Sequence, residues 1–187
     1  KTARREHPRI WMNPEQIEEF SEALKQDSNH CGFESFLHNS VERYAEQDFP
    51  KEPLPYPGDK RIIPMWRQNY TDCQRALGKI LKCDRWQEMA KKALLELAAW
   101  DVNGPTSRDY NDECAFRVVY GLAFGYDWLY DSLSPQERKI VAEALYQRIH
   151  QVAHHVIVDS RIHLSLYDSH AVRSLASVLT PCCISLL

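Results

Sequence analysis

The residue whose setting most suggests chemistry is His170. It ends the polar run Tyr167-Asp168-Ser169-His170 and directly precedes an apolar segment. A side chain that opens a helix after a polar loop commonly faces a cleft, and an imidazole there can donate to a carboxylate or carry a proton near neutral pH. From these residues alone, a helix-capping histidine is favoured over a catalytic one. Tyr167, on the same loop, is a candidate contact for a bound ligand.

A second group of polar residues, Asn111, Asp112 and Glu113, stands immediately before an apolar stretch with helical spacing. Acidic residues at a helix start complement the helix dipole and cap the first turn, and a role in binding a polar ligand is equally open. Arg117 follows Glu113 at the spacing of a surface ion pair. Its guanidinium could instead hold a carboxylate through two parallel hydrogen bonds. Asn111, Glu113 and Arg117 are therefore candidate binding residues.

Three histidines near one another invite a metal interpretation that their spacing does not support. On a helix only His150 and His154 share a face, His155 does not, and no third ligand is evident. A solvated helix end is favoured, because protonated histidine suits the dipole there. The six cysteines form no CxxC pair, and we expect buried free thiols. Neither a metal site nor a cofactor is expected.

The composition is that of a globular protein, with 44% hydrophobic and 26% charged residues in a chain of 187. The net charge of -3 gives no basic excess to hold DNA or RNA, so nucleic acid is not an expected partner. No run approaches the roughly 20 apolar residues that span a membrane. The first residues are charged with no apolar stretch behind them, so we expect no signal peptide in these residues. An anionic ligand would have to be held by local Arg, Lys and His.

Capping motifs predict where the helices that position these residues begin. Asn13, a proline at the first helical position and Gln16 form a capping box, and Met12 is placed to pack on Ile17. The same design recurs at residues 134–137. Both motifs predict helix starts from local sequence alone.

Apolar residues at helical spacing predict further helices over 66–80, 86–97, 116–128 and 140–152. Five prolines at 49–64 predict an extended connector. No segment shows the sustained alternation of a strand. The sequence therefore predicts an all-α fold of helical hairpins, as in a bundle, a solenoid or an (α/α) toroid.

Two further segments complete the organisation of the chain. Asn103-Gly104-Pro105 predicts a loop over residues 100–111. An apolar segment at 171–179 is followed by Pro181 and an apolar end without a polar cap. Such an end would normally be buried against later residues, so we expect the chain to be the truncated N-terminal portion of a longer protein.

Four groups of residues stand in a distinctive order along the chain. They are HPRIW at 7–11; WDVNGPTS at 100–107, followed by NDE at 111–113; YDWLYD at 126–131, leading into LSPQER at 133–138; and YDSH at 167–170. Taken together, the ordered set resembles the heparinase II/III-like polysaccharide lyases with a long N-terminal helical domain, related to oligoalginate lyases and dermatan sulfate epimerases. The resemblance covers nearly the whole chain. It departs at 82–84, where the join between two predicted helices is shorter than is usual in that group.

The resemblance implies an incomplete (α/α) toroid followed by β-sheet domains, with residues 1–187 supplying only the first helices. It implies cleavage of a uronic-acid polysaccharide, a glycosaminoglycan or alginate, by β-elimination without a redox cofactor. With it, His170 becomes the favoured catalytic residue. The implied partners are an anionic polysaccharide and the missing C-terminal segments, without which this portion alone should be inactive. The implied location is periplasmic or secreted.

Other activities remain open at this stage. A glycoside hydrolase on an α/α toroid would use two carboxylates from Asp112, Glu113 or Asp127. A non-catalytic sugar-binding module would bind oligosaccharide without turnover, and a uronyl epimerase would return the abstracted proton. Tyr126, Asp127 and Trp128 are expected to pack in the core around a buried polar bond, rather than to contact a ligand.

Overall fold

A computed structural model describes residues 6–42, 84–109, 112–159 and 180–186. The connector at 49–64 and the helix predicted over 66–80 lie outside these ranges. The described helices are α1 (Pro14–Gln26), α2 (Phe33–Phe36), α5 (Asp84–Ala98), α6 (Asp112–Trp128), α7 (Pro135–His154) and α9 (Thr180–Leu186), with short 3-10 turns at His30–Gly32 and Tyr130–Ser132 and π-helical turns at Leu37–Glu42 and His155–Asp159. Within these ranges there is no strand, and the prediction of an all-α fold is confirmed.

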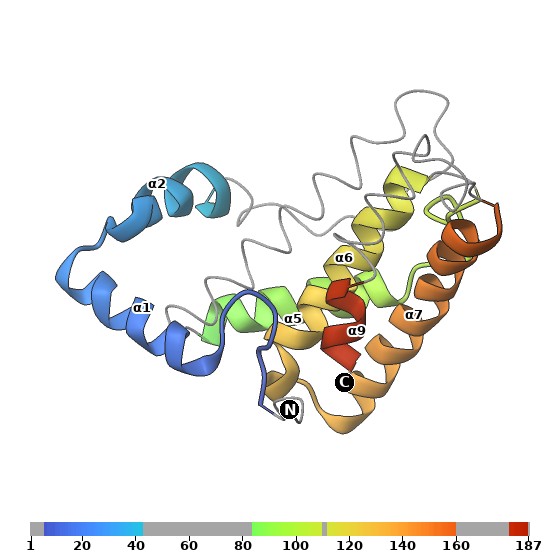
Figure 1. Ribbon diagram of the computed structural model, residues 1–187. Coiled ribbons are helices and arrows are strands. Elements are labelled where there is room, and N and C mark those ends of the chain that lie inside the picture. Colours follow the sequence, from blue (N-terminus) through green and yellow to red (C-terminus); the bar gives the residue numbers. More distant parts are fainter. Residues whose placement is uncertain (1–5, 43–83, 110–111, 160–179, 187) are drawn as a thin grey trace.

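Helix α6 is the central element, with α5, α7 and α9 all packed against it. Helices α6 and α7 run in opposite directions, joined by the short turn after Trp128, and α1 and α2 extend from this body as an arm (Figure 1). The segment that precedes α1 returns to the C-terminal end of α6, where Ile10 and Ile17 pack with Phe124 and Trp128. The N-terminal region is therefore fastened to the body by α6.

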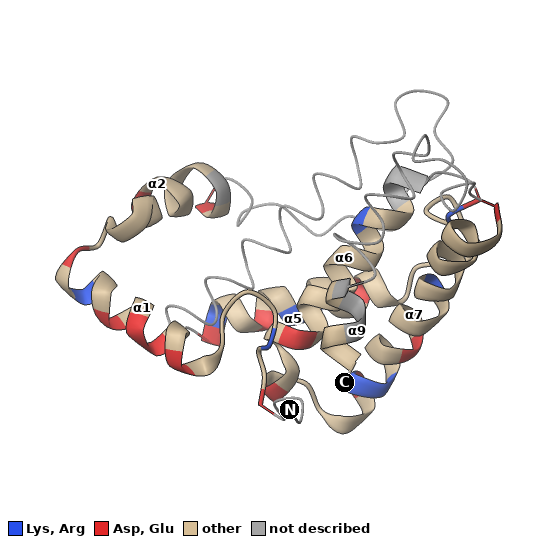
Figure 2. Ribbon diagram, viewed as in Figure 1, with Lys and Arg blue, Asp and Glu red and all other residues tan. Residues whose placement is uncertain are grey.

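The central position of α6 follows from its composition. A helix that is apolar around its whole circumference can be stable only when it is covered on all sides. Charged residues occur on α6 only towards its two ends, and its middle is uncharged (Figure 2). Its buried apolar side chains are Ala115, Phe116, Val118, Val119, Leu122, Ala123, Phe124 and Trp128.

Two glycines allow α5 to approach α6 closely. A Cβ built at Gly125 would lie 2.5 Å from Cδ1 of Leu94, and one at Gly121 would lie 3.0 Å from Cδ2 of Leu97. Both leucines are buried in the main core. Leu94 is fully enclosed, so it has little room to move away from a larger neighbour.

We predict that Gly125→Ala destabilises the protein by about 1–3 kcal/mol in urea unfolding, because it overpacks the α5–α6 contact. In an open helix the same change would stabilise by roughly 0.5–1 kcal/mol. Combining Gly125→Ala with Leu94→Ala removes the clash, so the double variant should be more stable than the sum of the two single effects. Strict additivity of the two changes would contradict this account.

Both predicted capping boxes are confirmed. The Asn13 side chain accepts from the Gln16 backbone and Gln16 returns the bond, while Met12 packs in the same cluster as Ile17. At the start of α7, Ser134 Oγ accepts from the Glu137 N–H at 3.3 Å and Glu137 Oε2 accepts from the Ser134 N–H at 2.8 Å. Local sequence was sufficient for these helix starts because every partner lies within five residues.

The α7 cap gives a pH prediction. The hydrogen bond from the Ser134 N–H lowers the pKa of Glu137 most. A smaller lowering comes from Lys91, whose Nζ lies 3.1 Å from Glu137 Oε2. A lowered folded-state pKa means that this stabilisation is present above the unfolded value of about 4.3 and is lost as the pH falls through the folded value. We expect Glu137→Gln to be less stable than the wild type at neutral pH and the difference to shrink below about pH 4. Ser134→Ala should cost about 0.5–2 kcal/mol at neutral pH. A wild-type/Gln difference that is constant with pH would contradict the assignment.

Three local features differ from the sequence predictions or add to them. Pro181 lies within α9 (Thr180–Leu186), whereas the apolar segment predicted at 171–179 lies outside the described residues. Cys31 is free, as predicted, but exposed rather than buried. It adopts a φ of 53° in the 3-10 turn between α1 and α2. Among the described helices, none combines the length and apolar character needed to cross a membrane.

Candidate functional site

The loop between α5 and α6 leads directly into the candidate residues at the start of α6. Its conformation is set by Arg148 of α7, a side chain only 1% exposed. The Arg148 guanidinium donates to the carbonyls of Trp100 at 3.2 Å and Asp101 at 3.0 Å. It also donates to the Thr106 carbonyl at 3.1 Å and the Thr106 hydroxyl at 3.3 Å. One planar cation thus holds both ends of the turn together.

A second side chain of α7 fixes the outer part of the same loop. Gln151 lies one turn after Arg148 and donates through Nε2 to the Val102 carbonyl at 2.9 Å and to Asn103 Oδ1 at 3.2 Å. Its Oε1 accepts from the Arg108 N–H at 3.3 Å. The loop predicted over 100–111 is therefore confirmed for the residues that the structure describes, and it is anchored rather than free.

The candidate residues are placed only in part. Glu113 lies in the first turn of α6, and Arg117 follows one turn later with a half-buried side chain. Asn111, Tyr167 and His170 lie outside the described residues. The structure therefore puts Glu113 and Arg117 on one helix beside an anchored loop.

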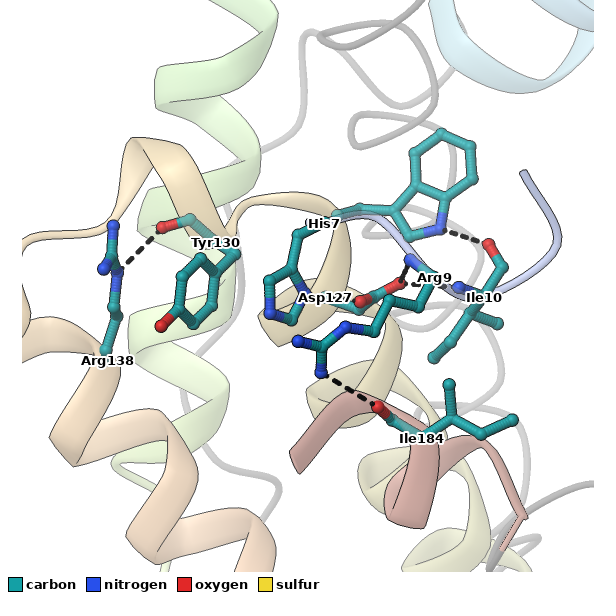
Figure 3. A network of polar contacts seen from close by, with 8 residues as sticks. His7, Arg9, Ile10, Asp127, Tyr130, Arg138 and Ile184 are labelled. Atoms are coloured by element: carbon teal, nitrogen blue, oxygen red, sulfur yellow. Dashed lines mark hydrogen bonds and ion pairs between the residues drawn. The ribbon is translucent and has the colours of Figure 1, made fainter. Parts of the chain in front are cut away.

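At the opposite end of α6, Asp127 holds a buried polar network together (Figure 3). Its side chain is fully enclosed. Oδ1 lies 2.6 Å from Nδ1 of His7, which is 4% exposed. Oδ2 accepts from the backbone N–H groups of Arg9 at 2.7 Å and Ile10 at 2.8 Å. The carboxylate thereby fastens the N-terminal segment to α6.

Aromatic and cationic side chains enclose this network. The His7 ring stacks on Tyr130 at 3.9 Å, and Arg138 lies over the Tyr130 ring at 4.0 Å (Figure 3). Arg138 Nε also donates to the Tyr130 carbonyl at 2.9 Å. Tyr126 meets Tyr130 edge-on, and burial raises the pKa of its phenol above the ordinary value, so it is neutral at physiological pH. The ordered packing identifies this cluster as structural.

The expectation that Tyr126, Asp127 and Trp128 pack around a buried polar bond is thus confirmed. It also removes Asp127 from the hydrolase alternative, because an enclosed carboxylate with three partners cannot serve as acid, base or nucleophile. At about 1.5 Å per residue, Glu113 and Asp127 lie roughly 21 Å apart along α6. A hydrolase pair needs a separation of about 5–9.5 Å. A pairing of Asp127 with either early carboxylate is wrong on both grounds.

His150 and His154 of α7 are exposed, whereas the His155 side chain in the turn that follows is only 14% exposed. His150 is exposed and contacts the Tyr146 ring edge-on at 4.4 Å. His154 and His155 lie 3.4 Å and 3.9 Å from Asp159 Oδ2. In the part of the chain that the structure describes, no cluster of three or more potential ligands could hold a metal ion.

The sequence interpretation missed Arg148. The pattern did contain a sign of it, because Arg148 falls on the same face of α7 as the apolar residues Val141, Leu145 and Val152. A cation in an apolar stripe must find acceptors when the helix is buried. Which carbonyls supply them could not be read from the pattern.

A comparison with protein-family models finds no match for this chain. A search of curated proteins finds none either. Any family assignment therefore rests on the residues of this chain and is a proposal.

Proposed function

We propose that this chain is the helical N-terminal portion of a polysaccharide lyase of the heparinase II/III type, acting on a uronic-acid polysaccharide by β-elimination. The support is the placement of the strings that carry the resemblance. HPRIW at 7–11 and YDWLYD at 126–131 meet in the Asp127 network. WDVNGPTS at 100–107 is held by Arg148. Each of these strings supplies contacts that set the fold, which is what a shared architecture requires of them.

The helix arrangement is compatible with the toroid part of the proposal. An (α/α) toroid is built from antiparallel hairpins, and α6 and α7 form one such hairpin with a short connection. Helix α5 packs against both of them. In the proposed enzyme, further hairpins continue the ring and later domains complete the active site. The same proposal carries a periplasmic or secreted location.

β-Elimination at a uronic acid requires that the carboxylate be neutralised, that a base take the C5 proton and that an acid protonate the leaving oxygen. We assign His170 to proton transfer or carboxylate neutralisation. Asn111, Glu113, Arg117 and Tyr167 are assigned to substrate binding. Arg117 suits a carboxylate because its guanidinium can donate two parallel hydrogen bonds.

The test uses the chain together with the segments that complete the enzyme, incubated with alginate, with heparan sulfate and with a neutral glucan. A lyase produces an unsaturated uronate that absorbs in the ultraviolet, and only from the two uronate polymers. New reducing ends without ultraviolet absorption would indicate a hydrolase. Epimerised product would indicate an epimerase, and binding without product a non-catalytic module.

We predict that His170→Ala lowers kcat by roughly 10²-fold or more, as expected for loss of a proton-transfer group. The melting temperature should change little. His150→Ala, which removes an exposed histidine on α7, is the matched control and should keep full activity. The 187-residue chain alone should show little or no turnover. Full activity of His170→Ala, or robust ultraviolet-absorbing product from the chain alone, would refute this assignment.

A further inference from the structure

Trp11 presents a large aromatic side chain to solvent from a strained backbone. The indole is 74% exposed. The φ of Trp11 is +65°, in the left-handed region that side chains other than glycine seldom adopt. The Met12 N–H donates to the Ile10 carbonyl at 2.8 Å and closes a tight turn around Trp11. Three-residue turns with positive φ are rare and strained.

Two buried contacts to Ile10, the residue before Trp11, hold this turn in place. Asp127 Oδ2 accepts from the Ile10 N–H at 2.8 Å, and the Trp128 indole donates to the Ile10 carbonyl at 3.2 Å. Strain of this kind persists only where the surroundings enforce it, and it concentrates at functional sites. The network around Asp127 therefore keeps the Trp11 indole in solvent, although burial would be the favourable state for so large an apolar group.

The Trp11 indole also packs against aromatic side chains of α6. It meets the buried Phe124 ring edge-on, with centroids 4.7 Å apart, and Tyr120 stacks on Phe124 at 4.1 Å. One part of the Trp11 ring thus packs against aromatic side chains of α6, and the remainder is exposed to solvent. The result is a rigid, flat aromatic surface about the size of a single ring.

We propose that Trp11 is a stacking platform for one uncharged sugar ring of the polysaccharide, an inference that rests on the proposed function. The face of a pyranose is lined by C–H groups and rimmed by hydroxyls, which suits an aromatic body with polar surroundings. A stable protein interface buries about 800 Å² per partner, far more than one indole supplies. A single ring of a chain-like ligand fits this surface better.

Neighbouring charge selects the kind of sugar. The exposed residues of α1, which begins three positions after Trp11, include four carboxylates, and Figure 2 shows them along that helix. They begin at Glu15, four positions after Trp11, and exposed charges interact over about one Debye length, roughly 8 Å. A uronate at Trp11 would be repelled there, whereas an N-acetylhexosamine would not. Trp11 therefore favours the hexosamine unit of an alternating glycosaminoglycan over the all-uronate alginate chain. The four exposed carboxylates of α1 on which this preference depends are Glu15, Glu18, Glu19 and Glu22.

The test measures binding of two hexasaccharides to the chain by calorimetry and intrinsic fluorescence. One alternates glucuronate and N-acetylglucosamine, and the other is an alginate hexasaccharide. We expect the alternating sugar to bind more tightly. Trp11→Gly, which accepts positive φ without strain, should fold normally and weaken that binding about tenfold or more. Trp11→Phe should keep most of it. Tyr146→Ala, which removes an exposed aromatic side chain of α7, should leave it unchanged.

The outcomes separate this inference from the proposed function. Three results would contradict the proposed role of Trp11: Trp11→Gly binds as the wild type does, alginate binds as well or better, or neither sugar binds. Each of them does so independently of the activity of the completed enzyme. If the wild type is a dimer that Trp11→Gly dissociates, the surface is an interface between copies and the platform is again wrong. If Trp11-dependent binding is found while the completed enzyme forms no unsaturated product, the platform stands and the lyase proposal falls.

Discussion

Replacing Asp127 by alanine should lower the free energy of unfolding by about 3–5 kcal/mol, because it removes the buried carboxylate that three groups contact and leaves them unpaired. His7 and the backbone N–H groups of Arg9 and Ile10 would lose their common partner in a buried or partly buried position. Such orphaned donors carry the full cost of desolvation. The loss should appear in urea unfolding, and hydrogen exchange at Arg9 and Ile10 should become much faster.

Two further variants sharpen this test. Asp127→Asn keeps one carbonyl oxygen for the backbone donors, so it should cost less, about 1–3 kcal/mol. Glu143→Ala removes an exposed carboxylate from α7 and should change stability by less than about 0.5 kcal/mol. If Asp127→Ala were as mild as Glu143→Ala, the network would not be what fastens the N-terminal segment.

The second large effect is expected at Arg148. Arg148→Met preserves much of the side-chain volume but removes the donors to Trp100, Asp101 and Thr106. We expect the free energy of unfolding to fall by about 3–5 kcal/mol. Buried carbonyls are left without partners, and a charged group that donates several hydrogen bonds is lost. The α5–α6 loop should also become susceptible to proteolysis while the remaining helices stay protected.

Arg148→Lys tests whether charge alone is sufficient. A lysine ammonium is a point charge and cannot span acceptors on both sides of the turn as a planar guanidinium does. It should therefore recover only part of the stability, leaving a deficit of about 2–4 kcal/mol. Lys139→Met, at an exposed position of α7, is the control and should be nearly neutral. Full rescue by lysine would contradict the geometric account.

The candidate site was accessible to sequence reasoning only as separate pieces. The apolar spacing placed Arg117 on a helix and Glu113 just before it, whereas in the structure α6 already includes Glu113. The polar bond at Asp127 was expected, but its partner His7 was not, because the two are 120 positions apart. The sequence pointed to Trp11 only as a member of the HPRIW group at 7–11, because neither its exposure nor its positive φ can be predicted from residue type.

The sequence by itself determined the helices. Caps such as Ser134 with Glu137, and the apolar spacing that follows them, act over one or two turns, so their energetics are contained in a few consecutive residues. Only the tertiary structure decided which distant groups meet. Arg148 finds carbonyls more than 40 positions earlier, and Asp127 finds the N-terminal segment. A buried polar group must have a partner, but any suitably placed donor or acceptor satisfies that need, and the choice is made when the helices pack.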